Sequence, residues 1–170
     1  PACYIKIKAG KVEKVYKYWD IPNCAPIKQN TNSCVEKVTK ALNKSISNCL
    51  DADVPVGVFL SGGVDSSLIA AITKQHNPNI KAFSLGYKEE QFNEIPYAEK
   101  VAKHLSIEHK KIIINEDDAI KILPKLVKAF GQPFGDASAI PTYYISKFAS
   151  KDVKVCLSGD GGDELFGGYW

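Results

Sequence analysis

Arginine and methionine are both absent from this 170-residue chain. All 22 basic residues are lysines, which excludes a bidentate guanidinium clamp on a phosphate or carboxylate. A bound anion would therefore be held by backbone N–H groups, lysine or a metal ion. The net charge of +3 comes without a dense basic run, so we expect no nucleic-acid partner.

The sequence also lacks an apolar run long enough to cross a bilayer, and its first residues do not form a signal peptide. We therefore expect a soluble cytoplasmic protein with no membrane partner. The cysteines are odd in number, irregularly spaced and without a C-x-x-C pair, which disfavours a disulfide framework or a zinc site. They are Cys3, Cys24, Cys34, Cys49 and Cys156. Because there is no initiator methionine, and the chain ends within a glycine-rich motif, we expect a piece of a longer protein.

Hydrophobic periodicity predicts strands that alternate with helices. The predicted strands are 56–60, 80–85, 109–114 and 153–157, and the predicted helices are 31–50, 67–75, 94–105, 117–130 and 138–150. Residues 4–18 alternate loosely and predict a hairpin, which a linker over 20–32 follows. This order is typical of an α/β fold with a doubly wound, mainly parallel sheet and helices on both faces.

A glycine-rich loop from Ser61 to Ser67, with the sequence S-G-G-V-D-S-S, lies between a predicted strand and a helix. Glycine lets backbone N–H groups approach an anion, and a helix N-terminus adds free N–H groups and a positive dipole end. The loop has neither a Walker A lysine nor a G-x-G-x-x-G pattern. Taken alone, it fits either a phosphate cradle or a glycine turn with a serine cap.

A second glycine-rich loop, from Ser158 to Gly168, follows the last predicted strand. Asp160, Asp163 and Glu164 place three carboxylates within five residues of this loop. Beside a nucleotide, their repulsion calls for Mg²⁺ or a role in proton transfer, whereas a solvated acidic turn is the alternative. Because ligands bind at the carboxyl ends of parallel strands, we expect both loops at one edge of the sheet.

Together these motifs resemble one enzyme family. The string S-G-G-V-D-S-S resembles the pyrophosphate loop of the ATP-pyrophosphatase superfamily. The segment from Leu157 to Tyr169 resembles the corresponding segment of asparagine synthetases. Residues 82–87 are similar to the second strand of that family, and residues 1–4 and 18–22 to the exit from its glutaminase domain. The resemblance implies a fold like that of the adenine-nucleotide alpha hydrolases. It also implies that residues 1–26 are the end of a glutaminase domain with its linker, and that 27–170 are a C-terminally incomplete synthetase domain.

The resemblance further implies ATP and Mg²⁺ as cofactors, and the amidation of a carboxylate through an acyl-adenylate with release of AMP and pyrophosphate. The residues implied to bind ATP are Leu60, Ser61, Gly62, Gly63, Asp65, Ser66, Ser67, Leu85, Ser158 and Gly159. Asp65 and Asp163 are implied as Mg²⁺ ligands. Asp160 and Glu164 are implied as catalytic residues, with Asp160 as the general base on attacking ammonia.

Two departures from the family pattern bear on the substrate. Asp160 stands where the family usually has glutamate, and the segment from Asp136 to Ile140 stands where asparagine synthetases tend to have an arginine. Aspartate is favoured as the acceptor, but a cell-surface sugar acid or another carboxylate stays open. Cys3 is internal, so ammonia would come from a glutaminase domain outside this chain. The sequence leaves open whether the protein forms a homodimer. It also leaves open whether this piece binds ATP without catalysing the reaction.

Three rival functions remain. A tRNA-modifying member of the superfamily tends to have paired cysteines or basic stripes, which this sequence lacks. A β-lactam-forming cyclase shares the first loop and would differ only in a further C-terminal half. A non-catalytic nucleotide-binding module is disfavoured by the intact Asp65, Asp163 and Glu164. The histidines, among them His109, are isolated in the sequence and expected at the surface or in satisfied hydrogen bonds.

Overall fold

The computed structural model describes residues 1–22, 28–132 and 134–169. The chain divides into two compact units, Pro1–Lys37 and Val38–Trp170. The predicted domain boundary between residues 26 and 27 lies outside the described residues, and so does Cys24. Within the described part, no helix is long and apolar enough to cross a membrane.

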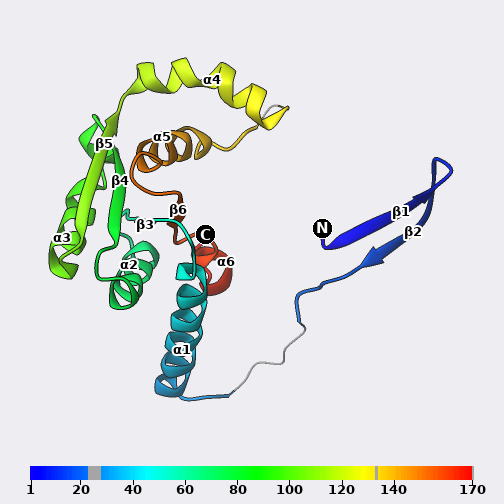
Figure 1. Cartoon of the computed structure of the whole chain (residues 1–170), viewed down its shortest axis with the longest axis horizontal. Coiled ribbons are helices and arrows are strands. Elements are labelled where there is room, and N and C mark those ends of the chain that lie inside the picture. Colours follow the sequence, from blue (N-terminus) through cyan, green and yellow to red (C-terminus); the bar gives the residue numbers. More distant parts are fainter. Residues whose placement is uncertain (23–27, 133, 170) are drawn as a thin grey trace. The chain divides into compact units, whose positions relative to one another are not determined.

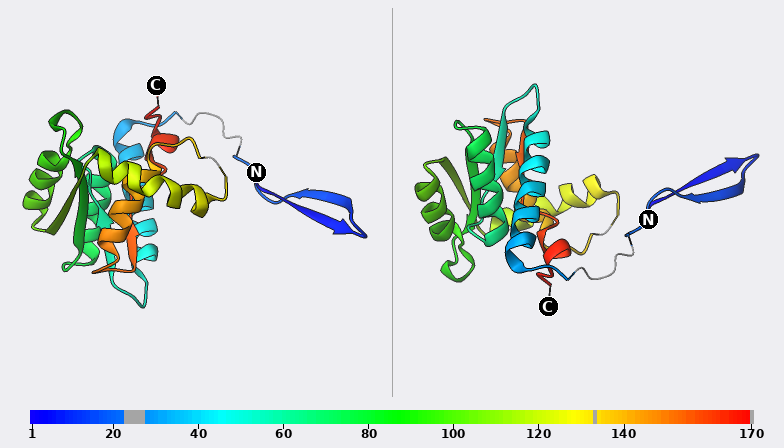
Figure 2. Two further views of the ribbon diagram at one scale, coloured as in Figure 1. Left: turned by 90° about the horizontal axis from the view of Figure 1, so that it is seen from above. Right: turned by 90° about the horizontal axis from the view of Figure 1, so that it is seen from below.

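The first unit contains the predicted hairpin, formed by β1 (Cys3–Lys8) and β2 (Lys11–Lys17). Figure 2 shows it as a two-stranded ribbon. Its turn residues Ala9 and Gly10 have φ of +49° and +73°, the left-handed values that a tight hairpin turn requires. The rings of Tyr4 and Tyr16 stack across the strands with centroids 4.8 Å apart. The hairpin prediction is confirmed.

The second unit contains a parallel four-stranded sheet of β3 (Val56–Phe59), β4 (Lys81–Tyr87), β5 (Glu108–Ile114) and β6 (Val155–Leu157). Their order across the sheet is β5-β4-β3-β6. Successive strands therefore run outward from β3 to β5, after which the chain returns to place β6 on the other side of β3. This reversal is a topological switch point, where open α/β sheets bind their ligands.

Helices cover both faces of this sheet, as Figure 1 shows. The long helices are α1 (Thr31–Leu50), α2 (Val64–His76), α3 (Ile95–Leu105), α4 (Glu116–Phe130) and α5 (Ala139–Ala149), and the short ones are η1 (Glu90–Phe92) and α6 (Gly162–Phe166). α2 and α3 pack on one face, whereas α5 packs on β4 and β5 from the other side. The doubly wound α/β fold is thus confirmed.

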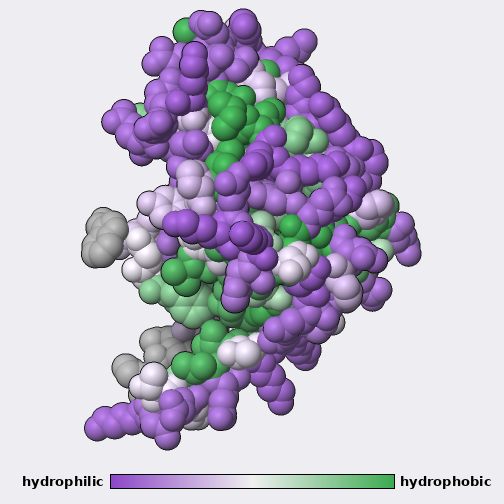
Figure 3. All heavy atoms as spheres, turned by 90° about the vertical axis from the view of Figure 1, so that its left-hand side faces the viewer, coloured by the Kyte–Doolittle hydropathy of each residue, from purple (hydrophilic) through white to green (hydrophobic). Residues whose placement is uncertain are grey.

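The core follows the alternation of side chains along each strand. On β3 and β4, Val58 and Ala82 belong to the cluster beneath α2 and α3, while Phe59 and Phe83 belong to the cluster beneath α5. Phe83 is fully buried and meets Phe148 edge-to-face at 6.2 Å. Outside this core, hydrophilic side chains cover most of the face seen in Figure 3.

Several element predictions differ from the structure. The last strand begins at Val155 and not at residue 153. The second predicted helix begins at Val64 and not at residue 67, because Gly63 is already extended and acts as its N-cap. The loop from Ser158 to Gly168 was predicted without a helix, yet it contains α6. Gly161 and Gly167 flank α6 with φ of +92° and +74°, so the same glycines that indicated a loop provide both helix ends. η1 was not predicted either.

Candidate active site

The first loop leaves the sheet at Leu60, whose side chain is 1% exposed. The backbone N–H of Leu60 donates to the Phe83 carbonyl at 2.9 Å, which continues the ladder one residue past β3. Its own carbonyl accepts from the Ser84 hydroxyl of β4. Both hydrogen-bonding groups of Leu60 are therefore tied to β4 at the point where the loop begins.

Serine hydroxyls organise the loop from within. Ser61 Oγ and Ser66 Oγ lie 2.9 Å apart, and the Ser61 N–H donates to Ser66 Oγ at 3.2 Å. The Gly63 N–H donates to Ser61 Oγ at 3.3 Å, and the Gly63 carbonyl accepts from Ser66 Oγ at 3.3 Å. Ser67 Oγ is buried with no hydrogen-bond partner among the described residues. The loop is thus preformed, and one buried hydroxyl next to it is unsatisfied.

Gly62 lets this loop lie directly against α3. Its φ is +89°, and a Cβ at this position would stand 2.6 Å from the backbone nitrogen of Ala98 and 2.7 Å from Tyr97. Real Cβ atoms do not approach backbone so closely, and a positive φ disfavours other residues. The glycine is therefore required by both conformation and space.

The two glycine-rich loops meet at Asp65, in the first turn of α2. A Cβ on Gly159 would stand 3.1 Å from Asp65 Cβ and from the Ser66 nitrogen. A Cβ on Gly162 would stand 2.4 Å from Asp65 Oδ2, so the Asp65 carboxylate lies against the Gly162 backbone. Since one loop follows β3 and the other follows β6, this contact lies at the switch point of the sheet.

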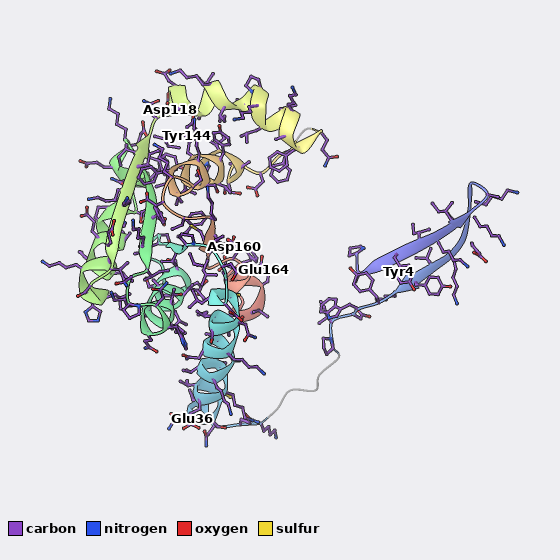
Figure 4. The ribbon with its side chains drawn as sticks, in the orientation of Figure 1. Tyr4, Glu36, Asp118, Tyr144, Asp160 and Glu164 are labelled. Carbon is purple, nitrogen blue, oxygen red and sulfur yellow. The ribbon has the colours of Figure 1, made fainter. Side chains whose placement is uncertain are left out.

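The carboxylates of the second loop have separate partners. Asp160 accepts a hydrogen bond from the Ser158 hydroxyl at 2.9 Å, and Glu164 Oε1 accepts one from the Tyr169 hydroxyl at 2.6 Å. The bond from Tyr169, assisted by backbone N–H groups, lowers the pKa of the Glu164 carboxyl, which favours its ionised form. Figure 4 shows Asp160 and Glu164 at α6. The Asp163 carboxylate lies against Gly168, where a Cβ would overlap Oδ1.

The predicted Mg²⁺ ligands fit a metal that is held together with a substrate. In the part of the chain that the structure describes, no group of three or more His, Cys, Asp or Glu side chains could enclose a metal ion. Mg²⁺ is commonly bound by one or two carboxylates, water and phosphate oxygens, not by a cage of protein ligands. Asp65 and Asp163 carry the carboxylate oxygens that such an ion prefers. Their role as ligands stays a prediction.

A pocket of about 280 Å³ opens beside the first loop, at the carboxyl ends of β3 and β4. It is lined by Phe59, Leu60, Ser61, Leu85, Tyr87, Glu94, Pro141, Thr142 and Ile145. Apolar side chains predominate, with a few polar groups from the strand ends, α3 and α5, as is common in small-molecule sites. The pocket is contiguous with the loop through Leu60 and Ser61.

The structure thus gathers most of the predicted site residues at one edge. Leu60 and Leu85 share the pocket, and the residues of the first loop contact the second loop through Asp65 and Ser66. The sequence did not identify Tyr87, Glu94 and Thr142 as pocket residues, nor Tyr169 as the partner of Glu164. Glu94 and Thr142 carry no motif of their own, and the packing of α3 and α5 on β4 brings them to the same pocket.

Comparison with known proteins agrees with this geometry. The chain is 40% identical over 154 residues to asparagine synthetase [glutamine-hydrolyzing] 1 of Bacillus subtilis, covering 91% of this chain and 24% of that protein. It is 32% identical over 184 residues to asparagine synthetase B of Escherichia coli, covering 98% of this chain and 32% of that protein. The chain thus spans about a quarter to a third of the length of these two relatives.

Solved structures with a similar fold are more distant in sequence. Glutamine-dependent NAD⁺ synthetase of Acinetobacter baumannii, solved with ADP, superposes with a TM-score of 0.58 at 21% identity, covering 92% of this chain and 30% of that one. The [4Fe-4S] U34-tRNA thiolase NcsA of Methanococcus maripaludis superposes with a TM-score of 0.54 at 18% identity, covering 78% and 48%. These likenesses show a fold of the adenine-nucleotide alpha-hydrolase type.

The match to a protein family covers most of the chain. The model of the family described as asparagine synthase matches residues 37–170, which include both glycine-rich loops and every strand of the parallel sheet. With the identities above, the chain belongs to the asparagine synthase family.

Proposed function

We propose that this chain is the part of an ATP-dependent amide-forming enzyme that binds ATP and activates a carboxylate as an acyl-adenylate. The supporting observation is the contact of Asp65 with Gly159 and Gly162. It joins the two loops at the switch point of the sheet, next to a pocket of about 280 Å³. Membership in the asparagine synthase family supports the same activity. We place the reaction in the cytoplasm.

In this proposal each part of the site has a role in binding ATP. The adenosine lies in the pocket between Leu60 and Leu85, where apolar walls favour a base. The β- and γ-phosphates lie on the N–H groups of the first loop and the N-terminus of α2, whose dipole favours an anion. The unsatisfied hydroxyl of Ser67 marks a position where a donor lacks its acceptor. Ser158 and Gly159 form the part of the site next to the α-phosphate.

The chemistry then proceeds in two displacements. A carboxylate oxygen of the acceptor attacks the α-phosphorus, the bond to the bridging oxygen breaks, and pyrophosphate leaves with that electron pair. Ammonia next attacks the acyl carbon, loses a proton to Asp160 or Glu164, and expels AMP to leave an amide. Mg²⁺, held by Asp65 and Asp163, would offset the charge that develops on the phosphoryl oxygens. The ammonia would come from glutamine.

Aspartate is the first candidate for the acceptor acid, because the family favours it. Asp136 favours an alternative, because it stands near the start of α5, beside an apolar pocket between α4 and α5. Hydrogen bonds from Ser138, led by its backbone N–H, lower the pKa of the Asp136 carboxyl and keep it ionised. With the acceptor in this pocket, the Asp136 carboxylate would repel a doubly acidic substrate, so a sugar acid or another carboxylate is the second candidate.

Calorimetry of the 170-residue chain with ATP and Mg²⁺ tests the binding step. Replacing Ser66 and Ser67 by alanine removes two hydroxyls from the phosphate cradle, and we expect affinity to fall at least about tenfold, since hydrogen bonds to charged groups are strong. Ser150→Ala is the matched control, because this serine is exposed at the far end of α5, where its hydroxyl donates to the Lys147 carbonyl. Equal ATP affinity in the double variant and the control would contradict the proposal.

A further inference from the structure

A buried hydroxyl connects three strands beneath the first loop. Ser84, in β4, is 2% exposed. Its hydroxyl donates to the Leu60 carbonyl at the end of β3, and it lies 2.6 Å from Nε2 of His109 on β5. The proposed roles of ATP-binding and catalytic residues leave Ser84 and His109 without a function.

The protons of this network can be assigned from its chemistry. A carbonyl oxygen only accepts, so the single Ser84 proton is directed to Leu60, and the Ser84 oxygen must accept from His109. His109 is therefore protonated at Nε2. Burial and the neighbouring Lys111 lower the pKa of the ring, while Glu99 on α3 opposes them. The ring is thus the neutral Nε2–H tautomer near pH 7, with both Ser84 interactions satisfied.

The network acts where β3 leaves the sheet. Backbone pairing of β3 with β4 ends at Phe59 and Phe83, and the Leu60 N–H makes one further ladder bond to Phe83. The Ser84 side chain then engages the Leu60 carbonyl. Because this carbonyl and the Ser61 N–H belong to the same planar peptide, fixing one fixes the other. The hydrogen bond from Ser84 therefore also fixes the orientation of the Ser61 N–H, the first N–H group of the loop.

We propose that Ser84 and His109 are positioning residues of the ATP site, which orient the Leu60–Ser61 peptide so that the loop is preformed for phosphate. This inference rests on the function proposed above. Binding is tighter when a site does not have to be ordered on association. His109 directs the Ser84 proton to Leu60 and so holds the loop without touching the nucleotide.

Four variants separate positioning from general stability. Ser84→Ala removes the bond to Leu60, and His109→Leu removes the donor to Ser84. His109→Gln keeps an N–H donor near the place of Nε2 and should rescue the network. Thr73→Val is the matched control, because the Thr73 hydroxyl, on α2, is also fully buried but has no hydrogen-bond partner among the described residues.

Two measurements on the 170-residue chain are needed, ATP·Mg²⁺ affinity by calorimetry and amide hydrogen exchange without nucleotide. We expect Ser84→Ala and His109→Leu to weaken ATP binding about three- to tenfold, the worth of one hydrogen bond. Exchange should accelerate in the peptide covering 60–67 more than in α3 or β5. His109→Gln and Thr73→Val should match the wild type in both measurements.

The outcomes are distinct. If exchange rises equally in the loop, α3 and β5, or if His109→Gln behaves like His109→Leu, the pair is merely structural and the inference is overturned. If the wild-type chain does not bind ATP, the proposed function fails. Loop exchange would then still decide whether Ser84 and His109 order residues 60–67.

Discussion

Gly62 shows how one residue allows the first loop to approach α3. Its φ of +89° disfavours alanine by about 1–2 kcal/mol, and a Cβ would also clash with Ala98 at 2.6 Å. Gly63 has φ of −69°, and its Cβ would meet only Ser61 Oγ at 3.4 Å. We predict that Gly62→Ala lowers the free energy of unfolding by more than about 2 kcal/mol, and that Gly63→Ala changes it by less than about 1 kcal/mol. Urea denaturation of both variants checks this, and similar losses would refute it.

The carboxylates of the second loop are expected to differ in their importance. Asp163 is proposed as a metal ligand, so Asp163→Asn should leave little activity even with excess Mg²⁺. Asp160 is proposed to take a proton from ammonia, a contribution of roughly 10²–10⁴ in rate, and water or Glu164 can replace it in part. The measurement is ammonia-dependent pyrophosphate release by the full-length variants. An active Asp163→Asn with an inactive Asp160→Asn would mean that the two roles are reversed.

Sequence reasoning reached these residues unevenly. Ser61 to Ser67 could be identified because contiguous glycine and serine residues form one motif. For Asp65 and Gly162 the sequence predicted only that their loops lie at the same edge of the sheet. Their direct contact could not be predicted, because no spacing rule gives the distance between two loops. The link from His109 to Leu60 was not foreseen, because it joins residues of different strands through a serine that looks ordinary in the sequence.

At the scale of elements, an ionic cluster joins the starts of β4, β5 and β6. Asp152, in the turn before β6, accepts from Lys81 at 3.0 Å and from Lys110 at 2.5 Å, with Glu108 within 3.8 Å of both lysines. These hydrogen bonds, from Lys110 first and then Lys81, lower the pKa of the Asp152 carboxyl below its ordinary 3.8. Its stabilising contribution is therefore present above about pH 4 and is lost as the pH falls further.

We predict that Asp152→Asn lowers the melting temperature at pH 6, and that the gap to the wild type narrows below pH 4 and with added salt. Thermal melts from pH 6 to pH 3 measure this difference. Asp53→Asn is the control, because Asp53 is exposed in the loop before β3. A gap that stays constant with pH would show that the charge of Asp152 does not stabilise the folded state.

The elements themselves were largely predictable, for different reasons. Each strand is a short apolar run bounded by turn residues, and α4 begins at a capping box in which Asn115 and Asp118 bond each other's backbone N–H groups. The short helix α6 was missed because its flanking glycines are typical of a loop. Contacts between helices were beyond prediction, such as the bond from the Tyr144 hydroxyl on α5 to the Asp118 carbonyl on α4. Both residues are labelled in Figure 4.

At the scale of the whole molecule, strand order decides where chemistry can occur. The order of elements along the chain allows β6 to pair beside either β3 or β5, and local sequence does not choose between them. Pairing with β3 places the loops from Ser61 and Ser158 on either side of the switch point. This arrangement brings the first turn of α2 within contact of the second loop. The proposed phosphate cradle therefore depends on the topology as much as on the motif.

The sequence of the first loop underlies a prediction of which bond of ATP breaks. A Walker A lysine, which reaches the β- and γ-phosphates in P-loop enzymes, is absent, and the first loop is instead proposed to hold both as a leaving group. The full-length enzyme should therefore form AMP and pyrophosphate, one of each per amide. With an acceptor whose carboxylate carries ¹⁸O, attack on the α-phosphorus should transfer one labelled oxygen to AMP. Mass spectrometry of the nucleotide measures both results, with glutamine or ammonia as the nitrogen source. ADP as the product, or unlabelled AMP, would exclude the acyl-adenylate.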